Sequence, residues 1–267
     1  MFFLHNARRL VGVFVCLLLS ACASLPQMSL PDGLPQTAEV AQVPFFPQQD
    51  NWCGPASLAT LLNFAGVVVT PQQLAPQVYL PGREGTLGAE LLATSRRYRH
   101  MPYLLRGEPQ VLLQELAAGH PVLVLLNLSL PPLSRWHYAV LTGYDATSRE
   151  FILHSGELAA TRLSWFSFQQ LWARGQNWAM LVLSPGQLPA TAEVGQILQQ
   201  GSVFEQMGAD DVARQIYLAA SLRWPDSSGV WFGLGNLAYR AGNLSDAELS
   251  WRRALLLDQD AVPARHN

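Results

Sequence analysis

Cys53 and His137 are the two residues whose types and settings predict nucleophilic chemistry. Cys53 stands directly before Gly54 and Pro55, and apolar residues then recur at helical spacing up to Gly66. Because Pro55 fits a first helical turn and Gly66 fits a helix end, we expect Cys53 at the N-terminus of a buried helix. The free amides and the dipole of that end stabilise a thiolate, so we expect a lowered pKa. An inert cysteine capping a core helix is the alternative.

The candidate base is His137. The segment that begins at His137 alternates between two sets of residues, His137, Ala139 and Leu141 on one side and Tyr138, Val140 and Thr142 on the other. This alternation and the apolar content predict a strand within a sheet. A histidine on such a strand, facing a helix N-terminus, gives the cysteine–histidine arrangement of a thiol enzyme. Gly54 is expected to leave room for a substrate backbone. Structural or surface roles are favoured for three other histidines, His100, His120 and His266.

The order of these residues resembles the bacteriocin-processing (double-glycine leader) cysteine peptidases, and more closely their stand-alone papain-like relatives. The resemblance covers about residues 43–185 and rests on Gln48, Cys53-Gly-Pro-Ala, an Ala-Gly-His-Pro-Val segment, and the His-Tyr-Ala-Val-Leu-Thr-Gly-Tyr-Asp segment from His137. It implies a nucleophilic Cys53, and His137 as general base and then acid. It also implies that Gln48, or Gln49 as the fallback, donates to the oxyanion beside the Cys53 backbone N–H.

One position departs from this family. Its members usually carry an aspartate, often followed by proline, on the strand after the histidine, where it orients the imidazole. Ser155 and Gly156 stand there in this chain, so Ser155 is the candidate orienter. A serine can fix a tautomer by hydrogen bonding but cannot stabilise an imidazolium by charge. Asp145 is expected to form a turn, and His154 to point to the other face from Ser155.

The elements that must position these residues follow from the apolar patterns. Helices are expected from Thr70-Pro71, over 86–97 and 109–118, and over 165–172. Strands are expected near 121–127, 136–143, 150–155 and 178–183. The predicted fold class is therefore α+β: a papain-like domain over residues 43–185, with a helical layer that holds the cysteine and an antiparallel sheet that holds the histidine. The proline-rich stretch 128–135 is expected to rim the cleft.

The N-terminus has the order of a secretory signal. Arg8 and Arg9 precede an apolar run that is too short for a membrane span of roughly 17–25 residues. The run ends in Leu-Ser-Ala-Cys22, which resembles the bacterial lipobox; an ordinary signal peptide is the alternative. The resemblance implies removal of residues 1–21 with Cys16, lipidation of Cys22, and anchoring in the cell envelope. Ala23 after the cysteine implies the outer membrane, facing the periplasm. Residues 22–42 are expected to form a flexible tether.

The C-terminal third carries an internal repeat. Six positions recur 34 residues further on: Gly201, Gly208, Ala213, Tyr217, Ala220 and Pro225 reappear as Gly235, Gly242, Ala247, Trp251, Ala254 and Gln259. This resembles tetratricopeptide repeats, which implies an all-α pair of hairpins over 194–261, after a linker (186–193) and before a tail (262–267). Two repeats are fewer than independent stability needs, so we expect them to dock on the first domain or on a protein partner. A plain amphipathic hairpin is the alternative.

Composition limits the functional classes. The 267-residue chain is 49% hydrophobic and 13% charged with a net charge of −2, which excludes a disordered chain and argues against nucleic acid. No histidines or carboxylates fall at ligand spacing, so neither metal nor cofactor is expected. The leading hypothesis is a lipid-anchored cysteine peptidase that acts on a peptide or protein. The alternatives are a catalytically degenerate envelope scaffold, and a thiol enzyme that transfers acyl groups to amines.

Overall fold

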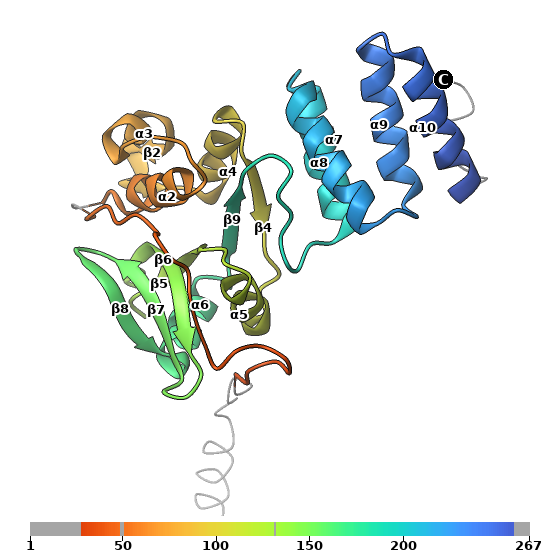
Figure 1. Ribbon diagram of the computed structural model, residues 1–267. Helices are drawn as coiled ribbons and strands as arrows, with labels where there is room; N and C mark the ends of the chain where they lie inside the picture. The colour runs from red at the N-terminus through yellow and green to blue at the C-terminus, as the bar shows by residue number, and fades with distance from the viewer. Residues whose placement is uncertain (1–27, 49–50, 131, 259–267) are drawn as a thin grey trace, which may run out of the picture.

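A computed structural model of the chain describes residues 28–48, 51–130 and 132–258 (Figure 1). The predicted signal peptide, Cys22, Gln49, His266 and the tail lie outside these residues. No helix in the described part of the chain is long and apolar enough to cross a membrane.

The centre of the first domain is an antiparallel sheet with the strand order β4-β9-β5-β6-β7-β8, in which β1 also pairs with β6. Val, Leu, Ala and Tyr residues alternate along its central strands and fill the space on both faces, as expected of a sheet covered on both sides. The strands are β1 (Thr37–Glu39), β4 (Met101–Leu104), β5 (Val122–Asn127), β6 (Trp136–Asp145), β7 (Glu150–Ser155), β8 (Leu158–Ser164) and β9 (Ala179–Leu183).

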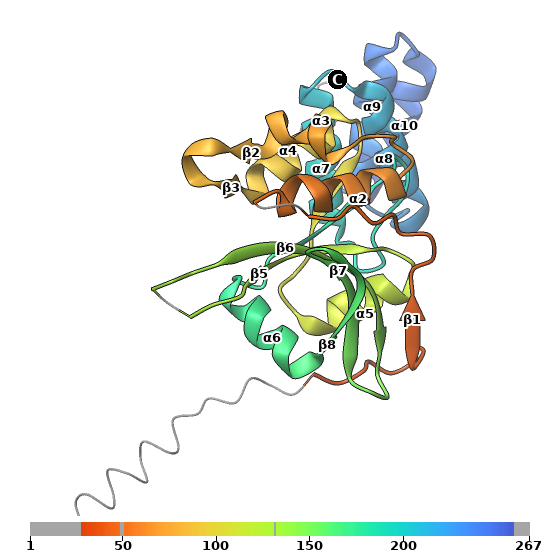
Figure 2. The same ribbon diagram turned by 90° about the vertical axis from the view of Figure 1, so that its left-hand side faces the viewer.

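Helices cover the two faces of this sheet (Figure 2). One face, through Leu123 and Val140, packs on α2 (Cys53–Phe64), α3 (Pro71–Val78) and α4 (Gly88–Arg97). The other face, through Val124 and Leu141, packs on α5 (Pro109–Ala117) and α6 (Trp165–Arg174). A two-stranded hairpin, β2 (Tyr79–Leu80) and β3 (Gly85–Thr86), with the short 3-10 helix η1 (Pro81–Arg83) between its strands, projects from the first layer. The predicted split between helices and antiparallel sheet is therefore present.

The C-terminal region is helical, with α7 (Val194–Gln206), α8 (Asp210–Arg223), α9 (Ser228–Arg240) and α10 (Leu244–Leu257). A Cβ atom added at Gly201 would lie 2.3 Å from the Tyr217 ring, and one at Gly235 would lie 2.4 Å from the Trp251 ring. The glycines therefore let each aromatic ring approach the facing helix. Their assignment to tetratricopeptide repeats stays a prediction.

The C-terminal helices contact the first domain, which is one of the two docking sites that the sequence left open. Buried residues of α7 and α8 belong to the same apolar core as α5. Polar contacts add to it: Arg96 donates to Gln200 at 3.3 Å, Arg99 pairs with Asp211, and the backbone N–H of Glu193 donates to the Tyr103 hydroxyl at 3.0 Å.

Residues 28–42 are not the flexible tether that the sequence predicted. Thr37–Glu39 form β1 and pair with β6, while Met28 and Val40 are buried in the core. Gly143 allows this pairing, because a Cβ there would lie 2.5 Å from the Ala38 carbonyl oxygen. The predicted start of α4 at Thr86 is also wrong, since Thr86 belongs to β3 and the helix begins at Gly88.

Candidate active site

Cys53 is the first residue of α2, as predicted. Pro55 and the following small and leucine side chains are buried, and Gly66, with φ +94°, ends the segment after the C-cap. No side chain caps the N-terminus of this helix. The amides at this end are therefore available to the thiol group and to a reacting group beside it.

The pKa of Cys53 is shifted upward, whereas the sequence predicted a downward shift. Burial raises the pKa of the thiol, and the backbone N–H groups of Tyr138, Gly54 and Cys53 itself, which lower it, do not compensate. The pKa therefore lies above its ordinary value instead of below. The amides of the helix end are present, but desolvation of the charged form outweighs them, so the free protein holds a thiol.

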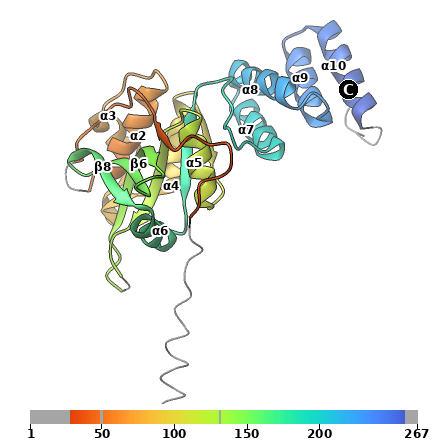
Figure 3. The same cartoon turned by 60° about the horizontal axis from the view of Figure 1, so that its bottom comes forward.

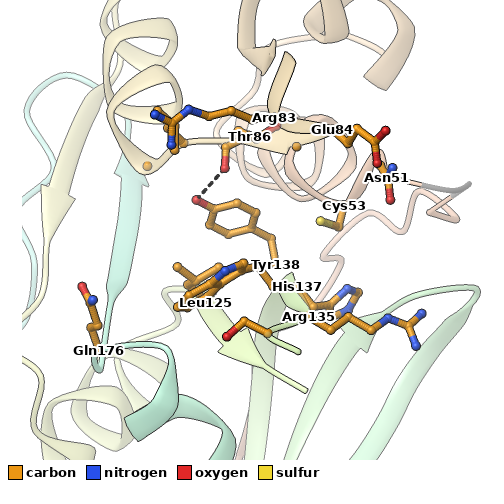
Figure 4. A pocket seen from close by; sticks show the side chains of 15 residues that line it. Asn51, Cys53, Arg83, Glu84, Thr86, Leu125, Arg135, His137, Tyr138 and Gln176 are labelled. Atoms are coloured by element: carbon orange, nitrogen blue, oxygen red, sulfur yellow. Dashed lines mark hydrogen bonds between the residues drawn. The ribbon is translucent and has the colours of Figure 1, made fainter. Parts of the chain in front are cut away.

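His137 lies on β6, opposite Leu126 of β5. Burial, and then the positive charge of Arg135, lower its pKa below the ordinary value. The imidazole is therefore neutral at neutral pH and has a nitrogen free to accept a proton. Cys53 and His137 line one cavity of about 750 Å³, with Cys53 on the helical side and His137 on the sheet side (Figure 4). The structure thus brings together the two residues that the sequence singled out.

Ser155 lies where the orienting residue was expected. Its hydroxyl oxygen is 2.9 Å from Nε2 of His137. In the tautomer that donates from Nε2 to Ser155, Nδ1 is the free nitrogen and can take the proton of a thiol. A hydroxyl fixes this tautomer, yet it adds no negative charge to favour the imidazolium.

Gln48 is a structural bridge between three elements. Its Nε2 donates to the Tyr138 carbonyl oxygen at 3.2 Å and to the Ser57 hydroxyl at 3.3 Å, and its Oε1 accepts from the Gly156 N–H at 3.1 Å. The β6–β7 register continued from Val140–His154 would pair Tyr138 with Gly156. The Gln48 carboxamide stands between these two residues in place of a ladder contact.

This bridge bears on the predicted oxyanion role of Gln48. The side-chain amide of Gln48 already donates both of its hydrogens to protein oxygens. Gln48 is also not among the described residues that line the cavity. Donation to an oxyanion therefore requires that one of these contacts be exchanged, and the role stays a prediction.

Gly54 does not provide space for a substrate backbone, contrary to the expectation. A Cβ atom there would lie 2.4 Å from Cβ of Thr86, so the space is taken by β3. The Tyr138 hydroxyl donates to the Thr86 carbonyl oxygen at 3.3 Å, and this contact joins the sheet to the β2–β3 hairpin across the cavity (Figure 4).

Sequence reasoning missed the β2–β3 hairpin as a wall of the cavity. Arg83, Glu84 and Thr86 of this segment line it, together with Gln176 from the other side. Pro81-Gly82 is a turn-forming pair that marks such a hairpin. No sequence pattern places Gln176 there, because its position depends on the turn after α6.

The other polar candidates have structural roles. Asp145 accepts from the N–H groups of Thr147 and Ser148 in the predicted turn. His154 contacts the Val43 carbonyl oxygen at 3.3 Å, and so it does not share His137, the partner of Ser155.

No cluster of metal-binding side chains occurs within the described ranges. The two remaining described histidines have contacts of their own, His100 with the carbonyls of Tyr98 and Ala65 and His120 with Glu115.

Comparisons with known proteins relate the first domain to a family of peptidases. Residues 40–172 match the model of the Peptidase C39-like family. A C39-like peptidase from Bacillus anthracis matches with 20% identity and a TM-score of 0.47, over 55% of this chain and 98% of the other. The peptidase domain of Streptococcus ComA, a bifunctional ABC transporter, matches with 19% identity and a TM-score of 0.44, over 54% and 99%.

A third solved structure is a double-glycine-motif protease from an AMS/PCAT transporter in complex with its leader peptide. It matches with 19% identity and a TM-score of 0.44, over 59% of this chain and 100% of the other. No curated protein matches the chain. The family match confirms the predicted papain-like C39 peptidase fold of an antiparallel sheet and helices.

Proposed function

We propose that this chain, whose residues 40–172 match the model of the Peptidase C39-like family, is a cysteine peptidase with Cys53 as nucleophile and His137 as general base and acid. The observation that carries the proposal is the shared cavity: a thiol at a helix N-terminus and a neutral imidazole, held by Ser155, line the same space. The family match supports the reaction class, and the geometry supports the roles of the two residues.

The reaction begins from a neutral thiol and a neutral imidazole. Nδ1 of His137 takes the thiol proton while the Cys53 sulfur bonds to the peptide carbonyl carbon. The oxyanion forms next to the Cys53 backbone N–H; one such donor contributes about 2.7–4 kcal/mol in related chemistry. A Gln48 amide hydrogen is the second donor once it leaves Ser57 or Tyr138. The imidazolium then protonates the leaving amine, and water, activated by the same imidazole, releases the acid from the thioester.

For the location of the protein, the proposal is lipid attachment at Cys22. The Leu-Ser-Ala-Cys sequence and the preceding basic and apolar segments support it and favour the cell envelope, and Ala23 after the cysteine favours the outer membrane, facing the periplasm. Multiple acyl chains on one residue give stable anchoring.

The C-terminal helices are proposed to form two tetratricopeptide-like repeats that bind a protein partner or position the substrate. The glycine–aromatic contacts between α7 and α8, and between α9 and α10, support this role because they recur at the period of the sequence repeat. Contacts of α7 and α8 with the first domain hold this unit in a fixed relation to the cavity.

The test is cleavage of a mixed peptide pool by the mature protein in water enriched in oxygen-18. Hydrolysis predicts products with the heavy isotope in the new carboxylate, and their loss in Cys53→Ala and His137→Ala. A folded wild-type protein that cleaves no peptide, or a Cys53→Ala variant that cleaves equally well, contradicts the proposal. Amide products formed on addition of a primary amine would instead assign the thiol to acyl transfer.

A degenerate scaffold is the second candidate function. Two observations favour it: the imidazole contacts a serine instead of a carboxylate, and burial keeps Cys53 protonated. This alternative predicts that Cys53→Ala preserves the cellular function, whereas Gly235→Leu, which would force apart α9 and α10, abolishes it.

A further inference from the structure

Four large apolar side chains of the first domain are exposed on the β5–β6 connection, at the start of β6 and on α6. Leu130 and Leu133, in the connection between β5 and β6, are 68% and 80% exposed, and Trp136 at the start of β6 is 50% exposed. Phe166 on the outer side of α6 is 72% exposed. Large apolar side chains that are exposed to solvent on one face of a domain indicate an interaction surface.

Hydrogen bonds join described residues on the two sides of the β5–β6 connection. The Asn127 side chain, which is buried, accepts from the Arg135 N–H at 3.0 Å and donates to the Ser134 hydroxyl at 3.1 Å. The N–H of Leu133 donates to the Leu130 carbonyl oxygen at 3.1 Å. The backbone of both leucines is therefore hydrogen-bonded while their side chains are exposed.

The start of the described chain, α6 and this connection lie on the same side of the molecule. In Figures 2 and 3, α6 lies between the start of the described chain and the β5–β6 connection, and the C-terminal helices lie elsewhere. Two contacts agree with the pictures: Met28 and Phe166 line one shallow pocket, and Arg174 at the end of α6 donates to the Asn127 carbonyl oxygen at 3.2 Å.

Positive charge accompanies the apolar groups. Arg135 lies in the β5–β6 connection, Arg149 lines the pocket with Phe166, and Arg174 ends α6. None of the three forms an ion pair with another described residue. The nearby carboxylate of Glu150 is paired with Arg162 at 3.2 Å. Arginines next to exposed tryptophan and leucine side chains suit the boundary between phosphate headgroups and acyl chains.

We propose that this face rests on an anionic phospholipid bilayer. The face consists of four apolar residues and three arginines: Leu130, Leu133, Trp136, Phe166, Arg135, Arg149 and Arg174. The inference rests on the proposed lipidation of Cys22. Six Cα–Cα steps separate Cys22 from Met28, so a lipid on Cys22 holds Met28 within about 20 Å of the bilayer.

This orientation places the cavity at the membrane surface. Arg135 and Trp136 belong both to the proposed membrane face and to the lining of the cavity that holds Cys53. A polypeptide lying at the membrane surface therefore has direct access to the thiol. The apolar rim next to His137 serves to dock the enzyme, and the substrate class is a membrane-associated polypeptide.

The test uses the mature acylated protein in vesicles of phosphatidylethanolamine and phosphatidylglycerol. In a Cys53→Ala background, an environment-sensitive fluorophore is attached to the Leu133→Cys variant and, as a matched control, to the Leu256→Cys variant on α10, where the native leucine is 78% exposed. We expect a blue shift at position 133 and loss of its fluorescence with a lipid-borne quencher, and neither effect at position 256. Vesicles of neutral phosphatidylcholine should weaken the effect at 133.

Each other outcome overturns the orientation. A label at 133 that stays in water while the acylated protein remains on the vesicles contradicts the membrane face and leaves the peptidase proposal intact. If the label at position 133 responds to added peptide and not to vesicles, this face binds the substrate and not the bilayer. Equal quenching at 133 and 256 indicates non-specific adsorption. If the mass of the mature protein shows no acyl chains, the protein has no lipid anchor at Cys22 and the proposed orientation is wrong.

Discussion

Ser155→Asp supplies the carboxylate that this chain lacks. Ser155 lies 2.9 Å from Nε2 of His137, so an aspartate there places a negative charge in hydrogen-bond range of the imidazole. An opposite charge at such range raises the pKa of a histidine by about 1–3 units, or about 1.4–4 kcal/mol in favour of the imidazolium. The native His137 starts from a pKa below its ordinary value, because of burial and Arg135.

The same change affects the ionisation of Cys53. A thiol whose pKa exceeds 9.0 is less than about 1% ionised at pH 7. If the imidazolium is stabilised by one unit or more, the thiolate–imidazolium pair becomes at least about tenfold more populated. The rate of alkylation of Cys53 by iodoacetamide at pH 7 should rise by about that factor, and the alkylation midpoint should move to lower pH.

Two measurements check this prediction without a known substrate: the alkylation rate across pH, and the titration of His137 followed by NMR. Ser155→Asn is the matched control, because it has nearly the shape of aspartate without the charge. The reasoning is refuted if Ser155→Asp folds, yet shows the same His137 titration and the same alkylation profile as Ser155→Asn.

Three further changes test how the site and the domain are held together. Gly54→Ala should lower the free energy of unfolding in urea by about 1–3 kcal/mol, because the added methyl meets Thr86; Gly195→Ala, where an added Cβ meets no atom within 4 Å, should not destabilise the protein. Gln48→Ala should cost about 1–3 kcal/mol in the same assay, since it leaves buried partners unsatisfied; an unchanged stability would show that the bridge is dispensable. Glu115 is buried, which by itself raises its pKa, but hydrogen bonds from its neighbours lower the pKa overall, so its contribution is present above about pH 4.5 and is lost as pH falls through the folded pKa. Glu115→Gln should therefore lower Tm at neutral pH and flatten its dependence on pH in the acid range, and a parallel pH dependence in both proteins would contradict this.

The sequence predicted the parts of the fold that depend on regular apolar patterns. The helix that begins at Cys53 and the strand that holds His137 are where local spacing placed them, because each has a face that must be buried. Ser155 was predicted from the family resemblance, because it stands where the family carries its orienting aspartate, and its contact with His137 follows from the pairing of β6 with β7.

The remaining features depend on contacts between distant segments. Residues 37–39 look like part of a polar, proline-rich stretch, and they become a strand only because β6 offers a free edge beside Gly143. Gln48 is a bridge because Gly156, far away in sequence, stands opposite Tyr138. The raised pKa of Cys53 reflects burial under surrounding elements, which a local helix-end rule does not include.

The central claim is that His137 serves Cys53 as its base. The most direct measurement is the pH dependence of Cys53 alkylation in the wild-type protein and in His137→Ala. We predict faster alkylation of the wild type near neutral pH, and for His137→Ala a single ionisation at a pKa above the ordinary value of a cysteine. Identical profiles for the two proteins would contradict the account.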